Sequence, residues 1–214
     1  TLAEIDALVR PNTRAIFAEM LANPALIVLD IEKMAAAAHK HGLPLIVDNT
    51  FPTPFLCQPF QYGADIVTHS TSKYIEGHAT SIGGMVVEKG GFDWSNGRFP
   101  DFVEPDASYH GLIYTRDFKA CPYSVKLRAQ WIRDLGSPMM PFNAFMSMVG
   151  CETLHVRMER HCFNAQKLAE HLEQHPMVSW VNYPGLPASP QHAMAQKYLR
   201  GASGVLCFGV KGGA

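Results

Sequence analysis

Two short stretches of the sequence decide the fold: LPLIVDNTF at residues 43–51 and ADIVTHSTSKY at residues 64–74. Each begins with a continuous apolar run, which is typical of a β-strand covered on both faces. The alanine-rich stretch 31–41 precedes the first strand, Asp30 can cap its amino end, and Gly42 ends it. Strand, helix and strand at this spacing predict an α/β fold, a mostly parallel sheet with helical crossovers.

Hydrophobic periodicity extends the pattern in both directions. Residues 90–116 show no sustained period and predict a long ordered loop, and loops of that length are usually functional. The face of the longest helix is expected to hold Leu154, Met158, Cys162, Ala165, Leu168/Ala169 and Leu172. The other expected elements are helices at 2–9, 122–135, 142–149, about 152–174 and 193–199, and strands at 15–18, 82–87, 178–182 and 204–210.

Composition and charge exclude several classes of partner. The 214 residues have a formal net charge of −1, so no basic field exists to hold nucleic acid or an anionic membrane. Charged residues make up 17% of the chain, against roughly 25% in an average soluble domain. We therefore expect something other than water to cover part of the surface.

The sequence shows no feature of export or of a membrane anchor. No apolar run approaches the roughly 18 residues of a membrane span, and the first residues, TLAEIDALVRP, lack the regions of a signal peptide. Five widely spaced cysteines without a CxxC pair argue against a disulfide framework or a zinc site. His39 and His41 would face different ways on a helix, so no metal site is expected there. A cytoplasmic protein is predicted.

Polar side chains follow both deciding strands, at the edge where open α/β sheets bind ligands. Asp48 ends the first strand, and Lys73 lies close behind the hydroxyl residues that end the second. Pyridoxal 5′-phosphate (PLP) needs such a set, because a lysine forms its Schiff base, a carboxylate keeps its pyridine nitrogen protonated, and hydroxyls bind its phosphate. Taken singly, Asp48 could instead be a turn residue and Lys73 a surface lysine.

Further motifs make this set specific. They are Glu19-Met20-Leu21-Ala22-Asn23-Pro24, VDNTF at 47–51, Ser70-Thr71-Ser72-Lys73-Tyr74, Gly77-His78 and Gly83-Gly84, followed by PFNAF at 141–145, ETL at 152–154, RMERHC at 157–162 and VNYPGL at 181–186. In order and spacing the chain resembles the Cys/Met-metabolism PLP-dependent enzymes of aminotransferase fold type I. The resemblance covers nearly the whole chain.

The resemblance implies a role for each matching residue. Lys73 would be the Schiff-base lysine and the main proton carrier, and Asp48 would pair with the pyridine nitrogen. Ser70 and Ser72 would hold the phosphate, and Asn23 would donate to the phenolate oxygen of the ring. The family generally has Thr where this chain has Ser72, which keeps the hydroxyl. Supporting roles are implied for Thr50, another cofactor contact, and for His78.

The resemblance also implies that the chain is about the middle half of a longer subunit. Residues 1–150 would be the central part of the large PLP-binding domain, and residues 151–214 the linking helix and the start of a smaller α+β C-terminal domain. The family's ring-stacking aromatic residue would lie upstream and its substrate-binding arginine downstream. Family members are tetramers built from dimers that share active sites, so a homotetramer is expected and the low-charge surface would face other subunits.

The long loop points to one activity within the family. The string GGFDWSNGRFPDFVEPDASYHGLIY resembles the long segment of O-acetylhomoserine sulfhydrylases. The implied reaction is γ-replacement, in which O-acetyl-L-homoserine loses acetate and sulfide or methanethiol adds at the γ carbon. Methionine γ-lyase or cystathionine γ-synthase activity is the alternative within the family. A catalytically silent α/β module that binds a phosphate or a partner is the alternative from another class.

Overall fold

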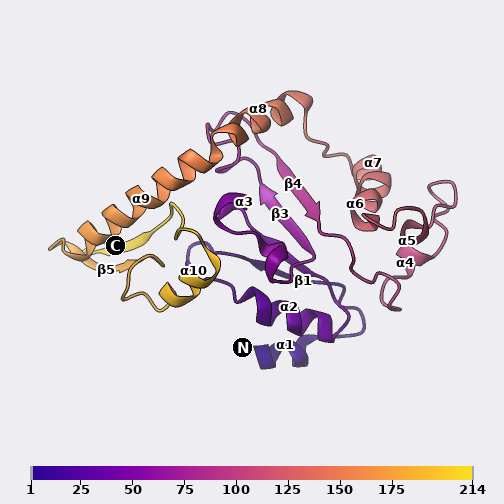
Figure 1. Ribbon diagram of the computed structural model, residues 1–214, viewed down its shortest axis with the longest axis horizontal. Helices are drawn as coiled ribbons and strands as arrows, with labels where there is room; N and C mark the ends of the chain where they lie inside the picture. Colours follow the sequence, from indigo (N-terminus) through magenta and orange to yellow (C-terminus); the bar gives the residue numbers. More distant parts are fainter. Residues whose placement is uncertain (1, 214) are drawn as a thin grey trace.

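A four-stranded sheet forms the centre of the molecule in the computed structural model, which describes residues 2–213 (Figure 1). The strands are β1 (Ile16–Glu19), β2 (Leu45–Asp48), β3 (Ile66–Ser70) and β4 (Gly84–Glu88), in that spatial order. The first three pair in parallel, and β4 pairs antiparallel with β3. The prediction of a mostly parallel sheet is confirmed.

Helix α2 (Ile31–Lys40) is the crossover between β1 and β2, and its cap is the predicted one, since Asp30 accepts a hydrogen bond from Lys33 N. It buries Ile31, Ala35 and Ala38 in the main core, where Leu45 and Val47 of β2 are also fully buried. Helix α1 (Leu2–Leu8) and the 3₁₀ turn Pro59–Tyr62 pack against α2, and the short helix α3 (Thr53–Leu56) packs against the later helix α9 (Leu154–Glu173).

The expected long loop is ordered and contains two single-turn helices, α4 (Pro100–Val103) and α5 (Tyr114–Asp117). An aromatic cluster fills it, in which the rings of Trp94 and Phe102 stack 4.4 Å apart. The helix expected at 122–135 is divided into α6 (Pro122–Lys126), the π-helical turn Leu127–Ile132 and α7 (Arg133–Leu135).

The remaining chain forms a long helical arm and a second sheet. Helix α8 (Pro141–Glu152) leads to α9 (Leu154–Glu173), which runs along one side of the molecule (Figure 1). Strands β5 (Val178–Asn182) and β6 (Cys207–Val210) then pair antiparallel, with α10 (His192–Tyr198) between them in sequence.

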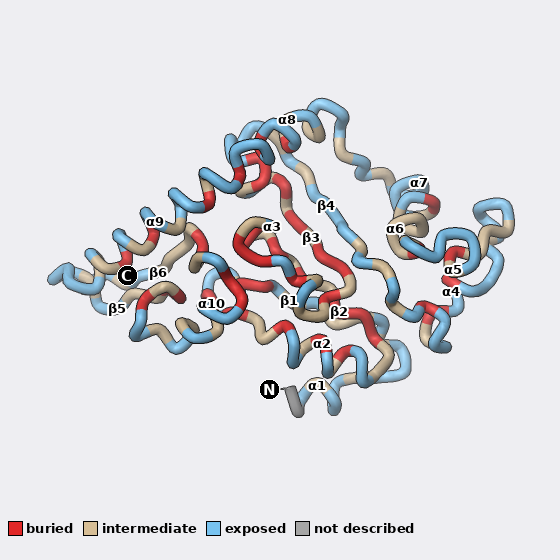
Figure 2. Tube along the Cα trace, viewed as in Figure 1, coloured by how far each residue is buried: buried red, intermediate tan, exposed pale blue. Residues whose placement is uncertain are grey.

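Burial on α9 only partly follows the predicted face (Figure 2). Leu154, Met158, Ala165 and Ala169 are buried, but Leu168 is 48% exposed. Leu168 was expected to share that face, and this is corrected because the buried positions form a narrower stripe that ends at its neighbour Ala169. No helix within residues 2–213 is long and apolar enough to cross a membrane.

Candidate active site

A cavity of about 180 Å³ lies at the carboxyl ends of β1, β2 and β3. Its lining includes five of the residues selected from the sequence: Asn23, Asp48, Thr50, Ser70 and Lys73. They come from the ends of three parallel strands or from the turns that follow those strands. The topology therefore brings to one edge of the sheet residues that are up to 50 positions apart in the sequence, as the strand-end argument predicts.

Asp48 and Thr50 join two strand ends. Asp48 ends β2 and lies in register with Thr68 of β3. Its Oδ1 accepts a hydrogen bond from Thr50 N at 2.9 Å, and Thr50 Oγ1 in turn accepts one from Ser70 N at 2.8 Å. Thr50 thus fixes the spacing between the carboxylate of Asp48 and the hydroxyl of Ser70.

Lys73 lies in the turn that follows β3. Its backbone N donates to Ser70 O at 3.3 Å, and its carbonyl accepts from Gly77 N at 2.9 Å. Ser72, which the family resemblance assigns to phosphate binding, does not line the cavity. Its hydroxyl instead accepts a hydrogen bond from Gly83 N at 2.9 Å, so it holds the turn to the start of β4.

Asn23 lies in a turn after β1, next to a cis peptide bond with Pro24. Glu19 at the end of β1 accepts a hydrogen bond from Asn23 N at 2.9 Å and lines the cavity itself. The roles inferred from the sequence gave no part to Glu19, Leu21 or Phe51, which are also in the lining. The signal for Glu19 was present, because a charged residue that ends a short apolar strand belongs to the same edge as Asp48.

His69 supports the electrostatics of this edge from within β3. Its side chain is buried, and its Nδ1 has no hydrogen-bond partner among the described residues. Burial lowers the pKa of His69, and the nearby charge of Asp48 only partly offsets this. Burial therefore favours the uncharged form of this imidazole.

A second, mostly apolar cavity lies at the opposite edge of the sheet. It measures about 630 Å³ and is lined by the aromatic cluster together with Ala15, Pro44 and Ile66, at the amino ends of the parallel strands. Ligands of open α/β sheets bind at the carboxyl ends. Within residues 2–213 no group of three His, Cys, Asp or Glu side chains could hold a metal ion.

Comparison with known proteins decides the family. The sequence model of a protein family, described as Cys/Met metabolism PLP-dependent enzyme, matches residues 1–214. The chain belongs to this family. Its relatives in the family include the homocysteine/cysteine synthase of Saccharomyces cerevisiae, 49% identical over 212 residues, and the O-acetyl-L-homoserine sulfhydrylase of Leptospira meyeri, 48% identical over 212 residues. These alignments cover 97% and 94% of this chain and 48% of each relative, so the chain spans about half the length of the curated relatives it matches.

Solved structures of family enzymes agree with the fold. A Campylobacter jejuni protein assigned as an O-acetylhomoserine (thiol)-lyase, crystallised with a pyridoxyl-lysine monophosphate, is 41% identical with a TM-score of 0.95, covering 99% of this chain and 53% of that one. Cystathionine γ-lyase from Lactobacillus plantarum is 31% identical with a TM-score of 0.79, covering 99% of this chain and 47% of that one. The expected fold type I architecture of this PLP-dependent family is confirmed.

The residues at the cavity fit PLP. A primary amine, a carboxylate on the neighbouring strand and a hydroxyl meet there in Lys73, Asp48 and Ser70. Together they are the donor and acceptor types that an aldehyde, a protonated pyridine nitrogen and a phosphate require. The predicted role of each residue stays a prediction that the experiments below test.

Proposed function

We propose that the longer protein to which this chain corresponds catalyses γ-replacement on O-acetyl-L-homoserine. The C–O bond at the γ carbon breaks and releases acetate, a C–S bond forms with sulfide or methanethiol, and the thiol proton is released to acetate or solvent. The products are homocysteine or methionine. The convergence of Lys73, Asp48 and Ser70 on one cavity carries the proposal, and the names of the relatives support the choice of substrate.

Bound PLP would supply an electron sink for the negative charge that develops at the α carbon of the substrate. Lys73 Nζ would hold the cofactor covalently before the substrate arrives and would then take the proton from the α carbon. Asp48 would keep a positive charge on the pyridine nitrogen, Ser70 would bind the phosphate together with the hydroxyl of Ser72, and Asn23 would bind the ring oxygen. Ser72 Oγ donates to Gly83 O at 3.2 Å here, so donation to a phosphate would replace that bond, while the bond accepted from Gly83 N could remain.

The test uses the full-length protein with bound PLP. Acetate and homocysteine are measured after O-acetyl-L-homoserine and sulfide are added, and borohydride reduction followed by peptide mass analysis locates the covalently bound cofactor. We expect the pyridoxyl mass on Lys73, and a loss of turnover of about 10³-fold in Lys73→Ala, within the range for general acid–base groups. Lys119→Ala, which removes an exposed lysine distant from the cavity, is the matched control.

The same assay separates the alternatives. Release of 2-oxobutanoate and ammonia from methionine, without uptake of a thiol into O-acetyl-L-homoserine, would assign methionine γ-lyase activity instead. Formation of cystathionine from cysteine would assign cystathionine γ-synthase activity. A protein that binds no PLP covalently would be the silent binding module.

We also propose a cytoplasmic homotetramer. Large apolar side chains on α8 support the assembly, since Phe142 is 65% exposed, Phe145 57% and Met148 69%. The five cysteines are all free, which suits a reducing compartment.

The boundary near residue 150 between the PLP-binding domain and the smaller unit remains a proposal, supported by the change there from the four-stranded sheet to α9 and the β5–β6 pair. Light scattering of the full-length protein tests the assembly.

A further inference from the structure

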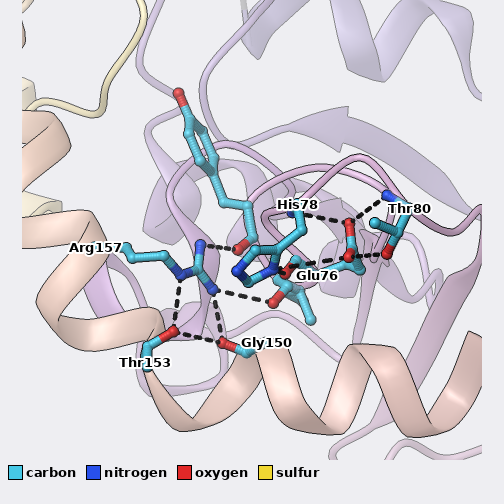
Figure 3. A network of polar contacts seen from close by, with 8 residues as sticks. Glu76, His78, Thr80, Gly150, Thr153 and Arg157 are labelled. Atoms are coloured by element: carbon cyan, nitrogen blue, oxygen red, sulfur yellow. Dashed lines mark hydrogen bonds and ion pairs between the residues drawn. The ribbon is translucent and has the colours of Figure 1, made fainter.

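A dense polar network joins α8 and α9 to the residues that follow Lys73 in the chain (Figure 3). One guanidinium makes four hydrogen bonds there: Arg157 Nη1 donates to Tyr74 O at 2.6 Å, Nη2 to Gly150 O at 2.7 Å and Ile75 O at 3.2 Å, and Nε to Thr153 Oγ1 at 3.1 Å. All four acceptors are uncharged. A single side chain thus ties the turn to the end of α8 and the start of α9.

The turn itself leaves two of these carbonyls without a backbone donor. Within it, Glu76 N donates to Thr71 O and Gly77 N donates to Lys73 O, both at 2.9 Å. No backbone N–H of residues 2–213 donates to the carbonyl of Tyr74 or Ile75. Buried carbonyls are nearly always hydrogen-bonded, so this turn requires a donor from outside.

Close packing leaves the turn little room to move toward α8. A Cβ atom on Gly150 would lie 2.3 Å from Glu76 O and 2.5 Å from Ile75 O. A Cβ atom on Gly77, whose φ is +78°, would lie 2.3 Å from Arg157 Nη1. Only glycine permits both approaches without a shift of backbone or guanidinium.

The residues after Tyr74 are fixed by other contacts as well. Ile75 is 3% exposed and packs against Leu154 and Met158 of α9. Glu76 is fully buried, and its carboxylate accepts hydrogen bonds from His78 N, Thr80 N and Thr80 Oγ1. Tyr74 O is therefore the point nearest to Lys73 where α9 holds the backbone, and Arg157 is the group that holds it.

We infer that Arg157 is a positioning residue that sets the place of Lys73 Nζ in the cavity. The inference rests on the proposed function of Lys73. Arg157 does not line the cavity and acts through the backbone of Tyr74 and Ile75. A planar guanidinium reaches these carbonyls and that of Gly150 with two separate nitrogens, whereas a lysine ammonium offers one nitrogen to all of them.

The test compares Arg157→Lys with Arg160→Ala in the full-length protein loaded with PLP. Arg160 lies on the same helix, exposed, with its guanidinium over the ring of Phe163, so its removal leaves the turn untouched. We measure kcat and KM for O-acetyl-L-homoserine, the rate at which added PLP becomes fixed to Lys73 under borohydride, and hydrogen exchange at the amides of residues 74–77. Thermal midpoints are recorded for each variant.

Arg157→Lys is expected to lower kcat and the labelling rate about 10- to 100-fold, because a misplacement of about 1 Å can cost about 10²-fold in rate. In Arg157→Lys, KM should change by less than about threefold and hydrogen exchange at the amides of residues 74–77 should rise. The control Arg160→Ala should match the wild type in all of these measurements. Thr153→Val, which removes one acceptor of Arg157, should show a smaller loss of the same kind and serves if Arg157→Lys does not fold.

One result would contradict the role of Arg157, and a different result would contradict the proposed function of Lys73. A lower thermal midpoint with unchanged kcat and labelling per folded molecule would make Arg157 purely structural and overturn the inference. Absence of label on Lys73 in the wild type would instead overturn the proposed function.

Discussion

Replacing Asp106 by asparagine should loosen the long loop that distinguishes this chain. Its carboxylate accepts hydrogen bonds from Tyr114 Oη at 2.5 Å, Gln130 Nε2 at 2.6 Å, Ser108 Oγ at 2.7 Å and Ser108 N at 2.9 Å. Tyr114 is fully buried, and burial followed by the hydrogen bond to Asp106 raises its pKa, so the tyrosine remains a donor. One carboxylate thus connects the loop at 106–108 to α5 and to the π-helical turn.

The size of the effect follows from the pKa of Asp106. Burial alone would raise this pKa, but the hydrogen bonds from Tyr114, Ser108 and Gln130 outweigh it and lower the pKa from 3.8 to about 2. At about 1.36 kcal/mol per pKa unit, the difference between the unfolded and folded pKa of Asp106 corresponds to about 2.4 kcal/mol in the free energy of unfolding. The carboxylate is partly open to solvent, so we reduce the expected loss in Asp106→Asn at pH 7 to about 1 kcal/mol.

The pH dependence gives the sharper test. The pKa of Asp106 is lower in the folded than in the unfolded protein. Its contribution to the free energy of unfolding is therefore complete above about pH 5 and is lost as the pH falls through about 4 toward about 2. The free energy of unfolding is measured by urea titration at pH 7 and at about pH 2.5, where most of the contribution of Asp106 is lost, for wild type and variant. Asp93→Asn is the control, because Asp93 makes the same kind of turn with Ser95 in the same loop without a buried tyrosine. An equal loss at both pH values, or no loss at pH 7, would refute the reasoning.

Two further predictions concern the core and the cavity. Met158→Ala removes a fully buried side chain between α9 and the Lys73 turn, and should lower the free energy of unfolding in urea by about 2–5 kcal/mol, while Met177→Ala, at a 53% exposed position, should change it by less than about 0.5 kcal/mol. Asp48→Asn keeps an oxygen for Thr50 N but removes the charge. It should weaken PLP binding about 10- to 100-fold by fluorescence titration, since a hydrogen bond to a charged group contributes about 1.5–3 kcal/mol, and an unchanged dissociation constant would contradict the assigned role.

The elements with a strong period and a recognisable end could be predicted from the sequence. Helix α2 begins after its Asp30 cap and ends before Gly42, and β5 covers the expected residues 178–182. The antiparallel direction of β4 could not be predicted, because its residues are mostly exposed on both faces and carry no clear pattern. The division of 122–135 was also missed, since the six residues of the π-helical turn are too few for a changed period to show in the sequence.

The candidate site was predictable where a residue directly follows a strand. Asp48 and Lys73 needed only the topology to meet at one edge, and Thr50 and Ser70 came with them. The phosphate role of Ser72 stays a prediction, because in this structure its hydroxyl bonds the backbone of Gly83. Glu19 was quoted in a motif but given no role, although its position at a strand end carried the same signal as that of Asp48.

The contacts that hold the site could not be predicted, because they join distant parts of the chain. Arg157 reaches Tyr74 across 83 positions, and on the other side of the cavity Asn182 Nδ2 donates to Ala25 O at 2.8 Å across 157 positions. Two of the three turns that carry cavity residues therefore have backbone carbonyls bonded by side chains from α9 and β5. The part of the chain after residue 150 does not line the cavity, yet its side chains bond the backbone next to Asn23 and Lys73. Substitutions in α9 and β5 should consequently alter the chemistry of a site that they do not touch.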